Sequence, residues 1–223
     1  MDVIEAILTR RSIRAFLPTP VPKETVAEIL DLAARAPSGT NMQPWKVYAV
    51  AGAAKEKLTK ETLAAIATEA EAHVPEYKYY PDEWVEPYKS RRQKVGLDLY
   101  SLLGLTRENK EGMRRQQGRN YEFFGAPVGL FFTIDKHLEV GSWLDYGMFV
   151  ENVMLIARAK GLHSCPQASW PPFHRILRKH LPIPEEEMVV CGMSLGYIDE
   201  AAPENHLETE RAPASEFAFF RGF

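Results

Sequence analysis

Apolar residues follow helical spacing in two stretches of the first 36 residues. Asp2 is suited to cap a short helix whose apolar residues are Val3, Ile4, Ile7 and Leu8. A second, one-sided helix is predicted between Pro22 and Pro37, with apolar residues at the i, i+3, i+4, i+7 and i+8 positions, namely Val26, Ile29, Leu30, Ala33 and Ala34. The chain therefore opens with two helices.

Runs of β-branched and aromatic residues predict three strands, at residues 45–51, 128–134 and 188–197. Helical patterns fill much of the chain between them. An Ala-, Lys- and Glu-rich helix is expected over 53–72, and helical pattern runs from about 89 to 124 with an interruption near Gly104. A short helix begins at Pro171 and Pro172. Because helices outnumber strands and the strands are far apart, an α+β fold is predicted.

The longest apolar helix is predicted within residues 142–161, with Ser142 as its cap and Gly161 as its stop. Apolar residues fall on almost every face of this helix, which predicts burial all round. In a chain of 223 residues, one of those faces is expected to meet a second subunit.

Two segments carry no regular pattern. Residues 75–88 hold three prolines and five aromatic residues, which suits either a cover over a site or a packed surface loop. Likewise, Tyr77, Tyr79, Tyr80 and Trp84 are suited either to stack on an aromatic substrate or to pack on a neighbouring helix. The tail after Asp199 either reaches a neighbouring subunit or ends loosely packed.

Composition narrows the class of protein. The length and the 45% hydrophobic content suit one domain spanning residues 1–223. The 27 basic and 30 acidic residues are scattered, which argues against nucleic acid or an anionic membrane as partner. Cys165 and Cys191 lack CxxC spacing and are expected to be reduced and buried. Without a signal-peptide pattern, a cytoplasmic location is the simplest expectation.

The common catalytic signatures are missing. The sequence has no GxGxxG after a strand, no GxxxxGKS-type phosphate loop, no HExxH and no GxSxG. Its six histidines show no paired metal-ligand spacing, so no metal site is expected. His163, just past Gly161, is interpreted as a cation that complements the helix end. Any catalysis is therefore expected to depend on a bound organic cofactor.

Two local motifs point to such a cofactor. Arg10-Arg-Ser-Ile-Arg14 places three guanidinium groups and a hydroxyl within five residues, a donor set suited to phosphate or to the anionic edge of a heterocycle. A basic run after a helix is otherwise a solvated complement to the helix dipole. The loop from Pro37 to Pro44 clusters hydrogen-bonding side chains before a strand, although an ordinary αβ connection has the same composition.

The two motifs together resemble the start of the nitroreductase family, of the FMN-dependent, oxygen-insensitive type. The resemblance rests on RRSIRAF and APSGTNMQPW, and continues through GAPVGLFFTI, GSWLDYGMFVENVMLIARAKGL, CPQASW, GMSLGY and the arginine of ETERAP. It covers nearly the whole chain and is weakest over residues 53–118. CPQASW and the aromatic-rich segment resemble the nitrobenzoate reductase branch.

The resemblance implies a nitroreductase-like fold with a mainly antiparallel central sheet flanked by helices, assembled as an intertwined homodimer with FMN at the subunit interface. Arg10 and Ser12, beside Arg11, would hold the phosphate or ribityl chain, with Arg211 as a second phosphate ligand and Arg14 at the pyrimidine edge. The partner subunit would supply the loop residues Pro37, Ser38, Gly39 and Asn41.

The same resemblance places Pro166, Gln167 and Ala168 along the flavin, with a backbone N–H directed at N5. The family often has a glutamate and a glycine in this segment, where the chain has Ala168 and Ser169. A backbone donor survives that change, whereas an acidic side chain does not. Cys165, beside Pro166, is interpreted as a small buried residue rather than a reactive one.

The implied activity is reduction of nitroaromatic or related small electron-poor substrates with NAD(P)H, by hydride transfer in a ping-pong cycle. Two alternatives stay open at this point. The same flavoprotein scaffold can serve a reductive dehalogenase or an enone reductase, because one fold hosts many reactions. The third possibility is a non-catalytic flavin-binding dimer.

Overall fold

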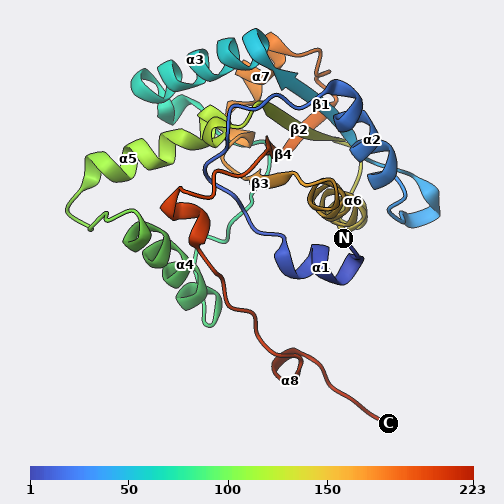
Figure 1. The fold of residues 1–223 in the computed structure, drawn as a ribbon. Helices are drawn as coiled ribbons and strands as arrows, with labels where there is room; N and C mark the ends of the chain where they lie inside the picture. Colours follow the sequence, from blue (N-terminus) through green and yellow to red (C-terminus); the bar gives the residue numbers. More distant parts are fainter.

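The computed structural model describes all 223 residues, and its centre is a four-stranded antiparallel sheet in the order β1-β2-β4-β3 (Figure 1). The strands are β1 (Lys46–Ala51), β2 (Val128–Asp135), β3 (His163–Gln167) and β4 (Glu187–Gly196). β2 and β4 occupy the centre, which explains why both read as long apolar runs. The predicted α+β class is confirmed.

Three of the strands lie where the residue pattern predicts them, and the fourth, β3, was not predicted as a strand. β3 is short and contains Pro166, which cannot donate to a ladder of hydrogen bonds and is therefore confined to sheet edges. β3 is indeed an edge strand, and it pairs with β4 through Cys165 opposite Ser194. A polar edge strand of five residues carries little periodic signal.

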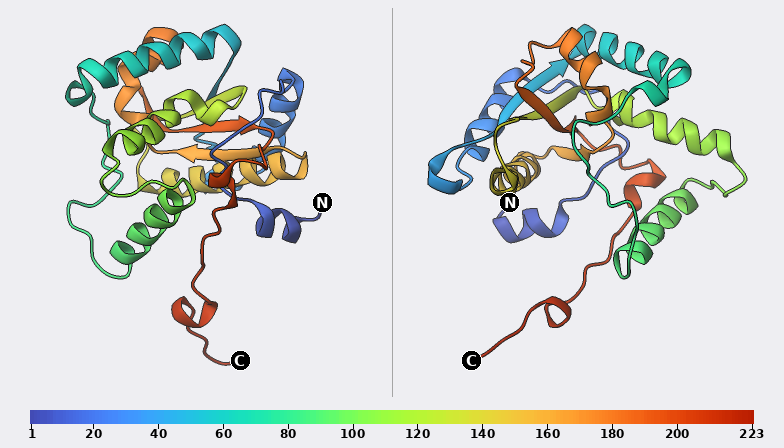
Figure 2. Two further views of the ribbon diagram at one scale, coloured as in Figure 1. Left: turned by 60° about the vertical axis from the view of Figure 1, so that its left-hand side comes forward. Right: turned by 180° about the vertical axis from the view of Figure 1, so that it is seen from behind.

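Helices cover both faces of the sheet (Figures 1 and 2). The side chains of β2 alternate between the two faces. Leu130 and Phe132 bury one face against α2 (Lys23–Ala33) and α6 (Val140–Ala159), while Phe131 packs with residues of α3 (Gly52–Thr68) and α7 (His174–His180) on the other. The core is thus split into two layers by one sheet.

The long helix α6 corrects two predictions. It begins at Val140, two residues before the predicted start, and its cap position is Glu139. Ser142 is not the cap; it lies buried inside the first turn. The predicted stop is confirmed, because Gly161 follows the helix end with φ +77°. Burial all round was wrong for the protomer, since Val140 is 82% exposed and Leu144 71% exposed.

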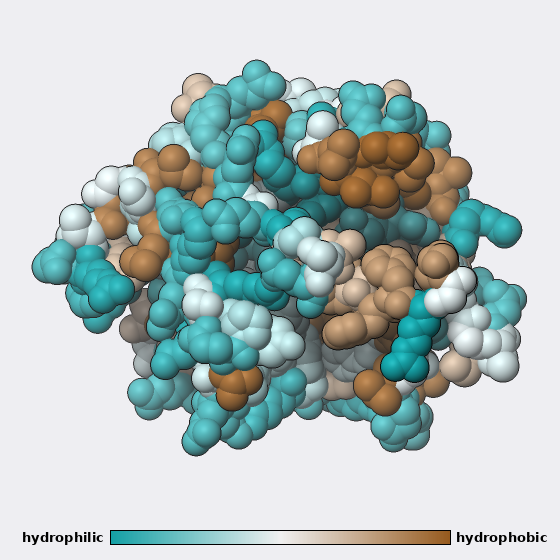
Figure 3. Space-filling model, turned by 90° about the horizontal axis from the view of Figure 1, so that it is seen from below, coloured by the Kyte–Doolittle hydropathy of each residue, from teal (hydrophilic) through white to brown (hydrophobic).

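Helix α1 (Val3–Thr9) has the predicted cap, with Asp2 accepting a hydrogen bond from the Glu5 N–H at 2.8 Å. Only Ala6 of this helix is buried, because the apolar side chains on its other positions (Val3, Ile4, Ile7 and Leu8) face outward. Figure 3 views the molecule from the side on which α1 lies and shows apolar surface gathered between hydrophilic areas. An apolar face therefore stays open beside α6.

The remaining elements surround the sheet. Residues 75–87 are irregular as predicted, and the predicted helical stretch is divided into α4 (Tyr88–Leu102) and α5 (Lys110–Gly118) around Gly104. Short 3₁₀ helices complete the fold: η1 (Gly39–Asn41), η2 (Ala70–Ala72), η3 (Arg119–Gly125), η4 (Pro171–Phe173) and η5 (Pro203–His206). The prolines predicted to begin a short helix open η4, which leads directly into α7.

The C-terminal tail, with α8 (Ala214–Phe217), runs away from the body of the protomer (Figure 2). Its aromatic residues Phe217, Phe219, Phe220 and Phe223 are exposed. No helix of the structure is long and apolar enough to span a bilayer.

Candidate functional site: a cationic cavity between the two ends of the chain

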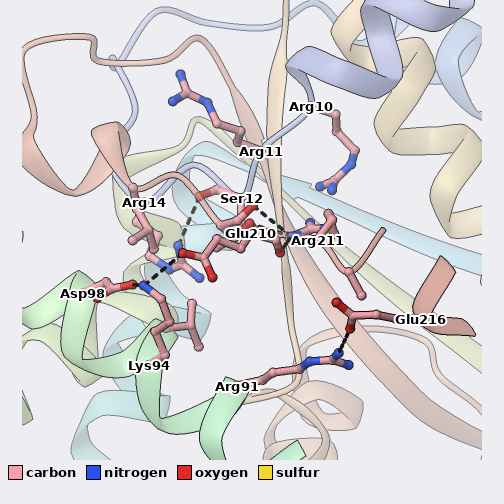
Figure 4. A pocket seen from close by; sticks show the side chains of 14 residues that line it. Arg10, Arg11, Ser12, Arg14, Arg91, Lys94, Asp98, Glu210, Arg211 and Glu216 are labelled. Carbon is pink, nitrogen blue, oxygen red and sulfur yellow. Dashed lines mark hydrogen bonds and ion pairs between the residues drawn. The ribbon is translucent and has the colours of Figure 1, made fainter. Parts of the chain in front are cut away.

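A cavity of about 580 Å³ lies where the segment after α1, the helix α4 and the C-terminal segment meet (Figure 4). Three acidic side chains line it: Asp98, Glu210 and Glu216. Six basic side chains line it as well: Arg10, Arg11, Arg14, Arg91, Lys94 and Arg211. The cavity therefore carries an excess of three positive charges, which favours an anionic ligand.

The first arginines are placed by an extended segment that runs along β3. Helix α1 ends at Thr9, and Ser12 forms a bridge to Ser164 while the Ile13 N–H donates to the Ser164 carbonyl at 3.0 Å. Side chains alternate along an extended chain, so Ile13 enters the core whereas Ser12 and Arg14 face the cavity. Burial of Ile13 thereby sets the direction of both neighbours.

These guanidinium groups are only weakly paired within the protein. Arg10 lies 3.5 Å from a Glu151 carboxylate oxygen, and Arg14 donates to the Ser12 carbonyl at 3.2 Å. Arg11 and Arg14 form no ion pair. Their donor capacity is thus largely open to a ligand.

The C-terminal segment brings Arg211, the position that the family resemblance singled out, to the same cavity. Its guanidinium is held by the Thr209 hydroxyl at 2.7 Å and the Glu210 carbonyl at 2.9 Å. Arg10 and Arg211, at opposite ends of the chain, therefore line one cavity (Figure 4).

Helix α4 supplies cations that were not predicted. Arg91, Lys94, Val95 and Asp98 line the cavity, and their spacing places them on one face of the helix. Lys94 pairs with Asp98 at 2.7 Å and with Glu210 at 3.6 Å, while Arg91 lies 3.6 Å from Glu216. The repeat of charged residues at i, i+3 and i+7 was the available signal, although alone it does not separate a site from a solvated face.

A second depression of about 1050 Å³ adjoins the first and shares Arg10, Arg11 and Arg211 with it. His163 lines this depression, and its pKa is lowered to about 4 by burial and by the neighbouring Arg158 and Arg11. The expectation that His163 is a cation at the end of α6 is therefore wrong, because the ring is neutral near pH 7. Its Nδ1 is buried without a hydrogen-bond partner.

The loop residues Pro37, Ser38, Gly39 and Asn41 do not line the cavity of their own protomer. The loop is fixed on α6, where the Gly39 N–H donates to Asp145 at 3.0 Å, and the Ser38 hydroxyl accepts from the Gln43 N–H at 3.0 Å. Thr40, Asn41 and Gln43 have φ of 50°, 61° and 52°. Left-handed backbone at three non-glycine residues is strained, and such strain is typical of functional loops.

The end of β3 carries the other predicted segment, and it also lies outside the cavity lining. Gln167 is 2% exposed. Its amide oxygen accepts from the Ser194 hydroxyl at 2.9 Å, and its amide nitrogen donates to the Asn120 carbonyl at 2.5 Å. Because this side chain is committed to the core, only backbone groups of the segment are free for a ligand. Pro166 is exposed and Ala168 is half-buried.

Both thiols are free and unreactive. Burial raises the pKa of Cys165 to about 11 and that of Cys191 to about 12. A protonated thiol is a poor nucleophile, which agrees with the interpretation of Cys165 as a small packed residue. Cys191 is only half-buried, although it was expected to be buried.

The aromatic segment 75–87 is anchored at its start, where Tyr77 packs on Trp143 at 4.7 Å between ring centroids and donates a hydrogen bond to the Val190 carbonyl. At its other end, the Arg92 guanidinium of α4 lies 4.9 Å from the Trp84 ring. Tyr79 and Tyr80 stay exposed between the two anchors. The exposed pair also packs, with 4.6 Å between the two ring centroids and 5.4 Å between those of Tyr80 and Trp84, while more than half of each residue stays open to solvent.

Comparison with known proteins identifies relatives of the whole chain. Residues 7–197 match the model of the nitroreductase family. The chain is 41% identical to a 4-nitrobenzoate reductase of Pseudomonas putida over 222 residues, covering 100% of this chain and 96% of the relative. It is also 41% identical to a chloronitrobenzene nitroreductase of Comamonas testosteroni over 216 residues, covering 97% and 95%.

A solved structure with the same fold is the FMN-dependent nitroreductase NfnB from Mycobacterium smegmatis in complex with NADPH. Its TM-score is 0.93 at 32% sequence identity, with 99% of this chain and 100% of that chain covered.

Proposed function

The chain belongs to the nitroreductase family, and from this we propose that it is an FMN-dependent enzyme that uses NAD(P)H to reduce nitroaromatic compounds. Residues 1–223 act as one domain in this proposal. Its relatives include a 4-nitrobenzoate reductase and a chloronitrobenzene nitroreductase. They favour reduction of a nitro group over reductive dehalogenation or enone reduction. The observation that carries the proposal is the cavity with its excess of guanidinium groups.

The donor set of the cavity fits FMN. A phosphate monoester carries up to two negative charges and three acceptor oxygens, and guanidinium forks match that geometry. The cavity volume of about 580 Å³ lies within the range of about 300–1,000 Å³ that small-molecule sites occupy. The three unmatched positive charges complement the phosphate and the anionic edge of a reduced flavin.

The proposed ligands are residues that line the cavity, and their individual roles are those that the family resemblance implies. Arg10, Arg11, Ser12 and Arg211 bind the phosphate or ribityl chain, and Arg14 faces the pyrimidine edge. Arg91 and Lys94 of α4 add positive charge on the opposite wall. The backbone of Pro166, Gln167 and Ala168 borders the ring, since Ser12 is bridged to Ser164 just before that segment.

FMN bound in this cavity would supply the hydride chemistry between NAD(P)H and the nitro group. The task of the chain is then to bind and to stabilise charge. A fixed cation at Arg14 stabilises the negative charge of the reduced state and raises the midpoint potential. No catalytic acid or base residue is proposed.

A homodimer completes the site in this proposal. The open apolar face of α1 and the exposed Val140 and Leu144 of α6 are suited to contact a second copy. A partner supplies the loop residues Pro37, Ser38, Gly39 and Asn41, which lie away from the cavity of their own protomer. The requirement for NAD(P)H and the two free thiols favour the cytoplasm as the location.

Anaerobic reconstitution tests the proposal. Apo-protein is mixed with FMN, reduced with NADPH or NADH, and then mixed with 4-nitrobenzoate while flavin absorbance is followed. We expect bound flavin to bleach with at least one nicotinamide and to recover with the nitroarene, in a particle with the mass of a dimer. A protein that binds no FMN, a bound flavin that no nitroarene reoxidises, or a strictly monomeric particle contradicts the proposal.

A further inference from the structure

Asn205, in η5, joins the two ends of the chain and lines the second depression, which adjoins the cationic cavity. It is 2% exposed, and its side-chain oxygen accepts from the Arg14 N–H at 2.7 Å and the Ala15 N–H at 3.2 Å. Its side-chain nitrogen donates to the Ala15 and Asp199 carbonyls, both at 2.8 Å. Three of these four bonds reach a segment about 190 residues away in the sequence.

An asparagine side chain has two acceptor sites and two N–H donors, so Asn205 uses its complete hydrogen-bonding capacity here. The Arg14 and Ala15 N–H groups lie in a segment that is not part of a regular sheet, and the Asn205 amide oxygen serves as their acceptor. The Ala15 carbonyl also accepts from the Asp199 N–H at 3.1 Å. Leaving a buried backbone N–H or carbonyl without a partner costs free energy of folding. The Asn205 amide therefore favours one position and one orientation relative to Arg14 and Ala15.

A neighbouring anchor holds the same C-terminal segment in a different way. The Glu204 carboxylate, also buried, pairs with Arg119 of η3 and forms no hydrogen bond or ion pair with residues 10–15. Leu207 is buried beside the cavity two residues after Asn205. Glu204 and Leu207 therefore attach the segment to the body, whereas Asn205 alone ties it to the backbone of Arg14.

We propose that Asn205 is a positioning residue that sets the distance and orientation between the N-terminal arginines and Arg211. The inference rests on the proposed function, because it assumes that FMN is the ligand. Arg14 is held through its own N–H, and Arg211 follows Asn205 by six residues in a segment whose register the amide fixes. Backbone bonds from the Asp199 N–H to the Ala15 carbonyl at 3.1 Å and from the Leu17 N–H to the Tyr197 carbonyl at 2.9 Å hold the two segments together before Asn205. Without the amide, the Arg14 N–H loses its link to the segment that carries Arg211, and the spacing between the two sets of arginines in the cavity is less fixed.

The test compares flavin binding by three variants. Asn205→Ala removes all four bonds, and Asn205→Asp keeps the shape and the two accepted bonds but loses both donors. Glu204→Gln is the control, because it weakens the neighbouring anchor without touching the Arg14 segment. For each protein, dissociation constants for FMN and riboflavin are measured from flavin fluorescence, together with the midpoint potential of bound FMN and the thermal unfolding curve.

We expect Asn205→Ala to weaken FMN binding at least tenfold and riboflavin binding by a clearly smaller factor. The ratio of the riboflavin dissociation constant to the FMN dissociation constant therefore falls. Asn205→Asp changes the ratio in the same direction by a smaller amount, which keeps the test decisive where the alanine variant does not fold. The midpoint potential becomes more negative in both Asn205 variants because Arg14 is displaced. Glu204→Gln leaves the ratio of the two affinities and the potential unchanged.

The measurements distinguish failure of the proposed function from failure of the positioning role. A wild-type protein that does not bind FMN overturns the proposed function itself. A wild-type protein that binds FMN, with Asn205 variants that keep the wild-type affinity ratio and potential, or with Glu204→Gln shifting them equally, overturns only the positioning role.

Discussion

Two clusters of charged residues in this protein differ in how their charges are matched. In the carboxylate cluster, at the start of β4, Glu187 is almost fully buried and accepts hydrogen bonds from Tyr48 at 2.9 Å and Thr133 at 2.5 Å, with the Lys46 ammonium 2.9 Å away. Nearby, Glu76 pairs with Lys136 at 2.9 Å and Arg178 at 3.1 Å. Every carboxylate in this cluster has its cation.

The cationic cavity shows the opposite arrangement. Six basic residues face three acidic ones, and Arg11, Arg14 and Arg211 have no carboxylate partner. Matched and buried charge holds a fold together, because each group replaces water with fixed partners. Unmatched and half-exposed charge does little for the fold and is suited to a ligand. The difference predicts that substitutions in the first cluster change stability and those in the second change binding.

The largest effect is expected for the double variant Arg10→Ala/Arg211→Ala. Each guanidinium is expected to contribute a charge-assisted hydrogen bond worth about 1.5–3 kcal/mol, so FMN binding weakens by about 100-fold or more. The free energy of unfolding of the apo-protein, measured in urea, changes by no more than about 0.5 kcal/mol per substitution. Arg221→Ala, in the exposed tail beyond the cavity, is the matched control. If the double variant and the control bind FMN with equal affinity, neither arginine belongs to the FMN site.

The next effect concerns the carboxylate cluster. Glu187→Gln removes the charge that Lys46, Tyr48 and Thr133 share, and is expected to lower the free energy of unfolding by about 2 kcal/mol. FMN affinity is expected to stay within twofold of wild type. Glu83→Gln, on an exposed loop, serves as control. If Glu187→Gln weakens FMN binding and leaves the free energy of unfolding unchanged, the carboxylate cluster does not serve stability alone, and the distinction between the two clusters is contradicted.

A pH dependence follows from the same cluster. Although burial opposes it, hydrogen bonds from Thr133 and Lys46 hold the pKa of Glu187 below its ordinary value of 4.5, and bonds from Lys136 and Arg178 do the same for Glu76. A depressed folded-state pKa contributes stability that is complete above about 4.5 and is lost as the pH falls through the folded value. Urea unfolding between pH 7 and pH 3 should therefore show a steeper loss for wild type than for Glu187→Gln. Parallel curves contradict this assignment.

The smallest predicted effect tests the acidic residues inside the cationic cavity. Glu210 and Glu216 pair with Lys94 and Arg91 at 3.6 Å and must give up these contacts in part to an anionic ligand. Exposed pairs are worth about 0.2–1 kcal/mol, so Glu210→Gln/Glu216→Gln is expected to strengthen FMN binding about threefold. Glu208→Gln, in the same segment and without a cation partner, is the control. Weaker binding by the double variant shows that these carboxylates support the site.

Much of the fold was open to prediction from the sequence because it depends on local pattern. The strands β1, β2 and β4 are apolar runs, and Asp2 and Gly161 are end signals that act within one turn. Ser142 failed as a cap because α6 begins two residues earlier, a boundary that tertiary packing decides. β3 was not predicted because its five residues, which are partly polar and include a proline, show no alternation of apolar and polar positions.

The residues of the candidate site also differ in whether local sequence reveals them. The arginine run after α1 was found because its members are adjacent in the sequence, and Arg211 through the family resemblance. Arg91 and Lys94 of α4 were missed because a charged helix face looks the same whether it meets solvent or a cavity. Asn205 was missed because its role exists only once two distant segments meet. The charge of His163 was misjudged because its burial beside Arg158 and Arg11 cannot be seen in the sequence.

Titration of the wild-type apo-protein with FMN and with riboflavin, over a series of KCl concentrations, tests the central claim most directly. If the unmatched guanidinium groups bind the phosphate, FMN binds about a hundredfold more tightly than riboflavin at low salt, and the difference narrows as salt screens the charges. Equal affinity for the two flavins at every salt concentration would contradict the claim.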